Sequence, residues 1–581
     1  MKDILKYSVR LIIACTMISY VGCADDKLTL YPEDKLSPET YFSNEEELEL
    51  WTNRFYNQLE SANSESGVCA DDVTAVRLGS ILMGERSPAS EDGWTWGMLR
   101  NINYYLQHSG NCKDFSAKQH YDGIAYFMRA YFYFEKVKRY GDVPWYGHVL
   151  NSNDELLFKP RDNRALVVDS ILNDLDKAIN MLRTTKSISR VTKWTALALK
   201  SRIALFEGTF RKYHGIGDYE KYLTQASEAS AEFISNSGYS LFTTGDDPYR
   251  TLFNSDKAIE QEIILARVYN QSLNIMHSVP FNISNTQQGL TKRFMNHYLM
   301  ADATKFTDIA GWETLQYTEE TIGRDPRMAQ TVLLPGYVQK GEKEVTVNSL
   351  VSITGYQPIK FVAEKKYDGN NKGVSDWPLF RTAEVYLNFA EAKAELGTLT
   401  QSDLDISINK IRARAKMPDL KLATANSTID PYLLSCYPNV STGTNQGVIL
   451  EIRRERTIEL VMEGFRIWDI FRWKEGKQLT NKIYGCYFPG EGKYDMDLDG
   501  ITDLQLWIKN KDTSFNGIYK KIGEDITLSN SSSGYIWASA PIIITWDEGR
   551  DYLWPIPASE RVLTGGVLTQ NPGYEDGTGY N

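Results

Sequence analysis

Hydrophobic residues recur with helical spacing in several long stretches of the chain. Across residues 121–140 the apolar side chains follow the i, i+3, i+4, i+7 pattern, which predicts one buried face of a helix. They are Ile124, Phe127, Met128, Tyr131, Phe134 and Val137. Gly141 and Pro144 follow directly, and this pair is typical of a helix end.

Other stretches show the same period. Helices are predicted over residues 45–59, 164–182, 192–207, 377–396, 404–415 and 449–473. Gly208 and Gly397 follow two of them, where glycine is typical of a helix end. The short connections suggest antiparallel neighbours. The pattern therefore predicts a mostly α fold, an α-α superhelix of tetratricopeptide-like hairpins, although no repeat consensus recurs at a fixed period.

Loop-rich segments separate and follow these helices. They cover roughly residues 242–342, 416–447 and 477–581, and their many aromatic residues argue against disorder. Long ordered loops in a compact protein usually carry function. We therefore predict one domain over residues 39–581, with a loop-rich lobe inserted mainly at 242–376 and 477–581.

The N-terminal residues predict export. A mostly apolar run over residues 11–22 is too short to span a bilayer but has the length of a signal-peptide core. The basic residues before it are Lys2, Lys6 and Arg10. A small residue directly before Cys23 is typical of a bacterial lipoprotein signal, in which the cysteine is acylated. We predict a signal peptide at residues 1–22, a lipid on Cys23 and a polar tether at 23–38; the alternative is an ordinary signal with a chance cysteine.

Composition narrows the class of partner. The chain has 581 residues and a net charge of −11, with no basic patch of the kind that neutralises phosphates, so no nucleic-acid partner is predicted. It contains 35 Tyr and 13 Trp. Their apolar faces and polar handles suit binding surfaces, although most of them must serve the core.

The cysteines and histidines show no metal-site or redox spacing. Four cysteines remain beyond the predicted signal and lipid site: Cys69, Cys112, Cys436 and Cys486. None forms a CxxC motif, and the six histidines form no HExxH motif. A disulfide between Cys69 and Cys112 is compatible with an oxidising compartment, and the sequence leaves that pairing open.

A series of short motifs follows in order along the chain. They are FMRAYFYF at 127–134, YGDVP at 140–144, VTK at 191–193, KSRIAL at 200–205, DPR at 325–327, GY at 355–356, FRTAEVYL at 380–387, AEA at 390–392, ER at 455–456, EL at 459–460, EGFRIWDIFRW at 463–473, LWPIP at 553–557 and NPGY at 571–574. Together and in this order they resemble the SusD/RagB family of nutrient-binding outer-membrane lipoproteins.

The resemblance implies a mostly helical fold of four tetratricopeptide-like hairpins under a loop-rich lobe. It implies binding of a glycan without chemistry of its own, and a partner: a SusC-like TonB-dependent barrel that the lipoprotein caps. It also implies a lipid-anchored position in the outer membrane, facing the cell exterior, and residues 24–26 (Ala-Asp-Asp) resemble an export tag for that face. Three alternatives stay open: a peptide- or glycopeptide-binding lid, a glycoside hydrolase, and a lid without a ligand site.

A charged cluster on one predicted helix bears on the hydrolase alternative. It comprises Glu455, Arg456, Glu459, Glu463, Arg466, Asp469 and Arg472. Paired carboxylates are what a glycosidase needs. Each acid here has an arginine within about a turn, which favours a paired structural network. We therefore predict that the chain is not an enzyme.

Two regions carry the side chains that sugar binding requires, aromatic faces for stacking and planar polar groups for hydroxyls. Both fall where the resemblance places parts of the family's glycan site. The first region holds Asp71, Asp72, Arg77, Arg86, Trp94, Trp96, Asn101 and Asn103, and the second holds Trp312 and Tyr317. The alternative for Trp94 and Trp96 is that they pack into the first hairpin.

An acidic loop predicts a calcium ion. Asp495, Asp497, Asp499 and Asp503 occupy positions 1, 3, 5 and 9 of a loop with glycine at position 6. Calcium prefers six to eight oxygen ligands, and the glycine permits the sharp turn. Leu506 stands where an EF-hand has glutamate, so the pattern is similar to a shorter extracellular DxDxDGxxD loop. The predicted role of the ion is structural, and no other cofactor is expected.

Overall fold

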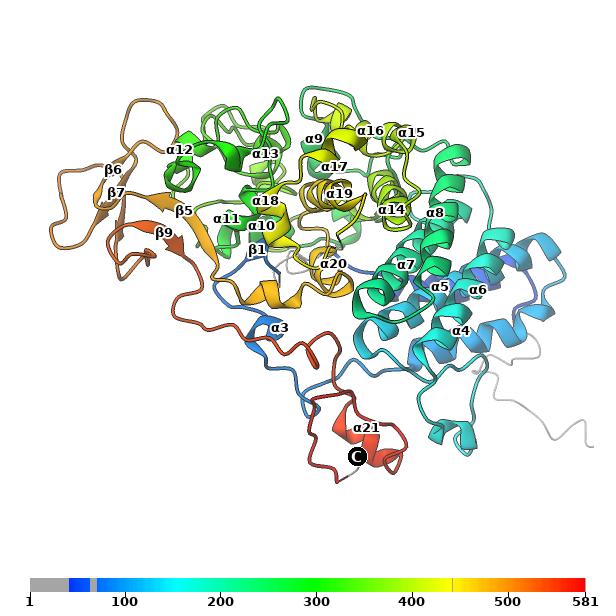
Figure 1. The fold of residues 1–581 in the computed structure, drawn as a ribbon. Helices are drawn as coiled ribbons and strands as arrows, with labels where there is room; N and C mark the ends of the chain where they lie inside the picture. The colour runs from blue at the N-terminus through cyan, green and yellow to red at the C-terminus, as the bar shows by residue number, and fades with distance from the viewer. Residues whose placement is uncertain (1–40, 63–69, 441, 580–581) are drawn as a thin grey trace, which may run out of the picture.

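The computed structural model describes residues 41–62, 70–440 and 442–579. Long helices form one side of the molecule and a lobe of loops and short strands forms the other (Figure 1). The long helices are α2 (Glu45–Asn53), α4 (Gly97–His108), α5 (Phe115–Tyr140), α6 (Arg164–Met181), α7 (Lys193–His214), α8 (Tyr219–Asn236), α14 (Thr382–Glu395) and α19 (Gln446–Glu459). This architecture confirms the predicted mostly α fold.

The central helix α5 shows how local chemistry sets its ends. The Asp114 carboxylate accepts hydrogen bonds from the backbone N–H groups of Ser116 and Ala117 at 2.9 and 3.0 Å, which caps the first turn. Gly141, with φ of 72°, ends the helix as its sequence position predicted. The apolar face of α5 packs against α6, and α7 packs against α8 in the same way.

The predicted helix end at Gly208 is wrong. Helix α7 runs on to His214 and ends at Gly215, whose φ is 72°. A Cβ atom at Gly208 would lie 2.8 Å from the Leu223 side chain and 3.0 Å from its backbone nitrogen. The glycine therefore serves the close approach of α7 and α8. Helices α4 and α8 were not predicted.

Three other boundaries differ from the prediction. Residues 377–381 form strand β4 (Trp377–Arg381), which pairs antiparallel with β2 (Ile263–Arg267) before α14 begins. Pro378 explains this, because a proline disfavours helical backbone at the residue before it. The 404–415 stretch divides into α15 (Gln401–Asp405) and α16 (Ile408–Arg414). The 449–473 stretch divides into α19 and α20 (Arg466–Arg472), with Met462 and Gly464 in left-handed conformation between them.

The lobe consists of short elements. Its helices and those that border it are α3 (Ser80–Met83), α9 (Pro248–Asn254), α10 (Val279–Asn285), α11 (Lys292–Met295), α12 (Tyr317–Glu320), α13 (Arg327–Thr331), α17 (Leu422–Ser427), α18 (Pro431–Cys436) and α21 (Ala558–Leu563). Its strands are β1 (Val73–Thr74), β3 (Gly289–Leu290), β5 (Tyr484–Phe488), β6 (Gly492–Tyr494), β7 (Leu504–Trp507), β8 (Ile518–Lys521) and β9 (Gly534–Trp537).

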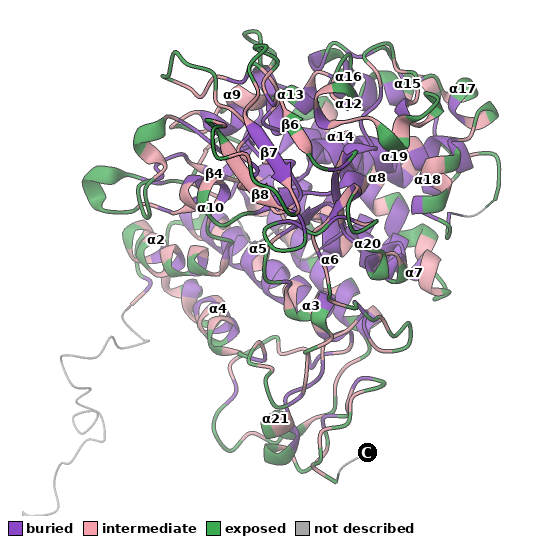
Figure 2. Cartoon of the chain, turned by 90° about the vertical axis from the view of Figure 1, so that its left-hand side faces the viewer, coloured by how far each residue is buried: buried purple, intermediate pink, exposed green. Residues whose placement is uncertain are grey.

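The strands form small separate sheets. β1 pairs with β3, β5 pairs with β9, and β6, β7 and β8 form a three-stranded sheet. One large apolar core fills the hairpins, and a second lies beneath the lobe. Figure 2 shows this arrangement, with buried segments in the interior and exposed loops around them. No helix in the described part of the chain is long and apolar enough to cross a membrane.

Candidate functional site

A groove of about 230 Å³ opens where α11, α18, β5 and β9 meet. Four aromatic residues line it, and we name it the Trp312 groove. They are Trp312, Tyr432, Tyr484 and Tyr535. The polar residues along the same walls are Asp71, Thr291, Lys292, Arg293, Asn296, Ser435, Gln478, Asn481 and Lys482.

The aromatic rings are held by one another and by the backbone. Trp312 is half-buried and meets Tyr432 edge to face, with ring centroids 6.2 Å apart. The Tyr484 and Tyr535 rings lie 5.4 Å apart at 32°. The Tyr535 hydroxyl donates to the Glu313 carbonyl at 2.5 Å, so β9 is tied to the segment that carries Trp312. Burial, and then the charge of Glu313, raises the pKa of Tyr535 to about 12, so its hydroxyl keeps its proton at neutral pH.

An arginine cluster lies behind one wall of the groove, which Asp71 and Arg293 line. Arg466 donates from Nε and Nη2 to the two oxygens of Asp71 at 2.6 and 2.8 Å. The Arg293 Nε lies 2.8 Å from the same carboxylate. Burial would raise the pKa of Asp71, but the two guanidinium charges outweigh it and hold the pKa well below its usual range. One carboxylate shared by two arginines leaves this wall with positive charge.

Asn296 has one buried side-chain atom without a partner in the described part of the chain. It lines the groove and is 5% exposed. Its Oδ1 has no hydrogen-bond partner within the described residues. A buried acceptor without a donor costs about 1–3 kcal/mol.

The structure brings two of the predicted site residues into this groove, Asp71 and Trp312. Asp72 is 2% exposed, and its carboxylate accepts the backbone N–H of Val73 at 2.9 Å. Arg77 is exposed and does not line the groove. Tyr317 is 2% exposed and donates its hydroxyl to the Leu333 carbonyl, so it belongs to the core beneath the lobe.

The two tryptophans of the first predicted region lie at a different cavity. Trp94 and Trp96 line a mostly apolar groove of about 330 Å³ beside α4 and α21. Trp94 is 6% exposed and packs edge to face on Tyr140 and Trp96, so it packs into the hairpin core. Trp96 and Asn101 are half-buried. The Asn101 carbonyl accepts from Trp51 Nε1 at 3.3 Å.

Two further residues of that region hold the fold together. Arg86 forms an ion pair with Asp551 at 3.1 Å, which fastens the C-terminal segment. Asn103 is buried, and its amide donates to the carbonyls of Tyr146 and His148 at 2.9 and 3.2 Å. Neither lies at the Trp312 groove.

Sequence reasoning missed most of the groove's lining, including Arg293, Asn296, Tyr432, Tyr484 and Tyr535. Tyr535 and Trp537 alternate with Gly534 and Ile536 along the sequence. This period of two predicts a strand with one aromatic face. Nothing local shows that this strand pairs with the segment around Tyr484, about fifty residues earlier.

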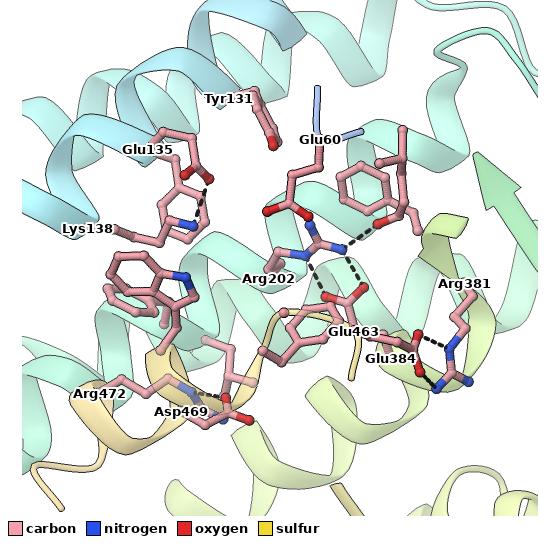
Figure 3. A pocket seen from close by; sticks show the side chains of 18 of the residues that line it. Glu60, Tyr131, Glu135, Lys138, Arg202, Arg381, Glu384, Glu463, Asp469 and Arg472 are labelled. Atoms are coloured by element: carbon pink, nitrogen blue, oxygen red, sulfur yellow. Dashed lines mark hydrogen bonds and ion pairs between the residues drawn. The ribbon is translucent and has the colours of Figure 1, made fainter. Parts of the chain in front are cut away.

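The charged cluster on α19 and α20 is a paired network, as predicted. Figure 3 shows part of it around a small buried cavity, with Glu463 bonded to Arg381 and Asp469 bonded to Arg472. Glu455 pairs with Arg327 and Arg412 at 2.9 and 2.8 Å. Glu459 pairs with Arg381 at 2.7 Å and also with Arg414. Glu455 and Glu459 are buried and Glu463 is half-buried, and each carboxylate is engaged by a cation.

The acidic loop follows strand β6. Asp495, Asp497 and Asp503 offer carboxylate oxygens within 4.8 Å of one another, whereas Asp499 is not part of this group. The Asp495 carboxylate also accepts backbone N–H groups of Leu498 and Gly500 at 2.7 and 2.9 Å, which closes the turn. Slight burial and the neighbouring acids raise the pKa of Asp497. Hard oxygen donors of this kind suit calcium.

One cysteine of the predicted disulfide, Cys112, lies within the described residues. Cys112 is buried, with its Sγ 3.6 Å from the Asp114 carbonyl. Cys69 lies outside the described residues, so its pairing with Cys112 stays open. Cys23 and the predicted signal and tether also lie outside them.

Loops on a hairpin scaffold build a groove of aromatic and planar polar side chains, which is the composition of a ligand-binding site. Sequence comparison then gives the family. The profile of the SusD family matches residues 262–574, and a second profile, described as "Starch-binding associating with outer membrane", matches residues 90–205. The chain belongs to the SusD family, as its motifs predicted.

Individual relatives agree over nearly the whole length. SusD-like protein P2 of Formosa agariphila is 22% identical over 98% of this chain and 100% of its own. A SusD-like protein of Bacteroides ovatus is 24% identical over 97% of this chain and 98% of its own. A crystal structure of a SusD-like protein from Bacteroides fragilis aligns with a TM-score of 0.68 at 23% identity, covering 94% of this chain and all of the other. This similarity confirms the predicted tetratricopeptide-like fold.

Proposed function

We propose that this protein captures a glycan at the cell surface and delivers it to a SusC-like TonB-dependent transporter in the outer membrane. In this proposal a lipid on Cys23 anchors the chain, and the ligand binds in the Trp312 groove. Membership of the SusD family supports the role. So does the fold, which it shares with a SusD-like carbohydrate binding protein from Bacteroides fragilis at a TM-score of 0.68.

The observation that carries the proposal is that aromatic rings and side-chain amides line one groove: Trp312 and Tyr432 with Gln478 and Asn481. A sugar ring presents an apolar C–H face and a rim of hydroxyl groups. The C–H face would stack on the Trp312 or Tyr432 ring, because aromatic faces carry partial negative charge. The hydroxyls would bond to the side-chain amides of Gln478 and Asn481. These groups are positioned by the fold before a ligand arrives, which lowers the entropy cost of binding.

Delivery requires binding without bond cleavage. The paired network on α19 leaves no carboxylate there free to act as a general acid, since each accepts from arginine or lysine. We therefore assign this chain the capture step and assign transport to its partner. Isolation of the lipidated protein from detergent-solubilised outer membranes is expected to co-purify a TonB-dependent receptor, identified by mass spectrometry. A lipoprotein that elutes alone after mild cross-linking in cells would contradict the assignment.

The binding test is affinity electrophoresis of the lipid-free protein through gels that contain starch, xylan, laminarin, mannan or pectin. We expect at least one gel to slow the wild-type protein. Trp312→Ala should migrate as it does in a gel without polysaccharide, while its melting temperature stays the same, because Trp312 is half-buried at the rim. Trp507→Ala, a half-buried tryptophan on β7 away from the groove, is the matched control. Free migration of the wild-type protein in all five gels would overturn the proposal.

The acidic loop is the site of a second proposal. We assign a structural calcium ion to Asp495, Asp497 and Asp503, which the fold brings together. The ion would relieve the repulsion among these carboxylates and fix the loop between β6 and β7. It has no part in glycan binding.

A further inference from the structure

Beside the Trp312 groove the β5–β9 pair presents a row of aromatic side chains. The half-buried residues of the two strands are Tyr484, Tyr487, Tyr535 and Trp537, whereas the other residues of both strands are buried. Residues i and i+2 of a strand point to the same face, so Tyr535 and Trp537 share one face of this ribbon. Figure 1 shows β5 and β9 side by side at the edge of the lobe.

The register places the rings in two cross-strand pairs. Tyr484 lies opposite Trp537, and Tyr487 lies opposite Tyr535. The Tyr487 and Tyr535 centroids are 5.8 Å apart. A register shift lies between the two pairs, so that β5 spans them with three residue steps and β9 with two. Because Tyr484 and Tyr487 both contact Tyr535, the rings lie on one face of the ribbon.

The ribbon is held rigidly on its inner face. The Cys486 backbone N–H donates to the Thr354 carbonyl at 2.8 Å. A Cβ atom at Gly485 would lie 1.9 Å from that same carbonyl oxygen, so the strand can approach this closely only with glycine there. Trp537 is fixed as well, because its Nε1 donates to Ser539 Oγ at 3.0 Å. The aromatic row is thus positioned without a ligand.

The row begins in the groove and ends in a second cavity. Tyr484, Tyr535 and Lys482 line the Trp312 groove, and Lys482 Nζ lies 4.5 Å above the Trp537 ring. Trp537 lines a separate cavity of about 200 Å³. That cavity is polar, and the side chains that can meet hydroxyl groups there are Gln287, Ser352, Lys520, Asp525 and Thr527.

From this continuity we infer that the Trp312 groove, the β5–β9 aromatic row and the Trp537 cavity form one extended binding surface for a polysaccharide segment of several sugar units. The inference rests on the proposed function and specifies its ligand as a long chain rather than a mono- or disaccharide. One sugar occupies the groove against Trp312. The chain then runs across the ribbon, and a distal unit stacks on Trp537 with its hydroxyls toward Gln287 and Asp525.

The test is isothermal titration calorimetry with a disaccharide and an octasaccharide, both cut from whichever of the five polysaccharides slows the wild-type protein. The octasaccharide is expected to bind more tightly to the wild type. Trp537→Ala should weaken octasaccharide binding by about tenfold and leave disaccharide binding within about twofold, as loss of one aromatic contact implies. Gln287→Ala, at an exposed side chain, should give a smaller loss with the same dependence on chain length.

The two proposals fail in different ways. Loss of both ligands in Trp312→Ala, together with unchanged octasaccharide binding in Trp537→Ala and Gln287→Ala, would overturn the extended surface and leave the groove in place. Equal wild-type affinity for the disaccharide and the octasaccharide would also overturn the extended surface and leave the groove in place. Unchanged binding in Trp312→Ala would overturn the groove. Failure of every polysaccharide to slow the wild type would overturn both, and Trp507→Ala controls for general effects of removing a tryptophan.

Discussion

Arg381 on β4 forms a two-pronged ion pair with Glu463, with Nε to Oε2 at 2.6 Å and Nη2 to Oε1 at 2.8 Å. The third nitrogen of the same guanidinium donates to Glu459 at 2.7 Å and to Glu262 at 3.2 Å. One buried side chain therefore connects the β2–β4 pair to α19 and to the turn before α20. Because these elements also border the lobe, the arginine joins the lobe to the hairpins.

We predict that Arg381→Met lowers the free energy of unfolding by about 3–5 kcal/mol, since removal of one partner leaves buried carboxylates without compensation. The control is Arg183→Met. Arg183 pairs with Glu45 at 2.8 Å, and both side chains are over 40% exposed, so its loss should cost less than about 1 kcal/mol. Urea unfolding measures both values. Similar losses for the two variants would show that the buried pair has no special role in stability.

The pH dependence of stability provides a second prediction, at Asp72. Burial raises the pKa of this carboxyl from 3.8 to about 7, and the adjacent Asp71 adds to the effect while Arg466 opposes it. Between these two pKa values the folded chain holds a proton that the unfolded chain has released. The contribution of this group to the free energy of unfolding therefore falls as pH rises from about 4 to about 7.

Asp72→Asn removes this proton without changing the shape of the side chain, and an amide oxygen can still accept from Val73. The variant should gain stability relative to wild type as pH rises from 5 to 8, by about 2.6 kcal/mol. Urea unfolding of the variant and the wild type at pH 5 and pH 8 measures this gain. The other titrating groups are the same in both proteins, so their contributions cancel. The variant should also bind glycan as the wild type does. Parallel stability curves for the two proteins would contradict a buried neutral carboxyl.

The sequence predicts the helices better than it predicts where they stop. A period of 3.6 marks the apolar face of α5 or α7, because burial requires it at every turn. Gly208 looks like a helix end but serves a contact with Leu223, about fifteen residues further along the chain. That contact exists only after α7 and α8 have packed. The strand at Trp377 was missed for a similar reason, since its partner β2 lies more than a hundred residues earlier.

The candidate site depends even more on contacts that only the packed fold creates. Trp312 was predicted from its residue type and from its region of the chain. Its neighbours in the groove come from segments far apart in sequence, such as Arg293 on α11 and Tyr535 on β9. Conversely, Asp72 and Tyr317 have suitable side chains but are buried in the structure. Residue type identifies what can bind a sugar, and only tertiary packing decides which of these groups face the groove.

A third prediction concerns the lipid anchor. In cells that express the full chain, Cys23→Ala should abolish incorporation of radiolabelled palmitate and move the protein from the membrane fraction to the soluble fraction. Each buried methylene of an acyl chain contributes about 0.8 kcal/mol to membrane affinity, so loss of the lipid should be decisive. Cys112→Ala, at a buried cysteine, is the control for loss of a thiol. Labelling of the Cys23→Ala variant would place the lipid elsewhere, and absence of label from the wild type would refute lipidation.

The last prediction tests calcium at the acidic loop. Wild-type protein should melt at a higher temperature in calcium than in excess EDTA, because a ligand at 100 times its Kd stabilises the folded state by about 2.7 kcal/mol. Asp495→Asn and Asp503→Asn should lose this difference and should melt like the wild type in EDTA.

Asp499→Asn is the matched control for these variants. Its carboxylate accepts the backbone N–H of Ile501 at 2.7 Å, a bond that asparagine preserves, and it stands apart from the group of three acids. A calcium shift that persists in Asp499→Asn would assign the ion to Asp495, Asp497 and Asp503 alone. Loss of the shift in Asp499→Asn would make all four acids ligands, as the sequence pattern predicted. If the wild type melts at one temperature in both buffers, the loop is closed by the backbone bonds of Asp495 and needs no ion.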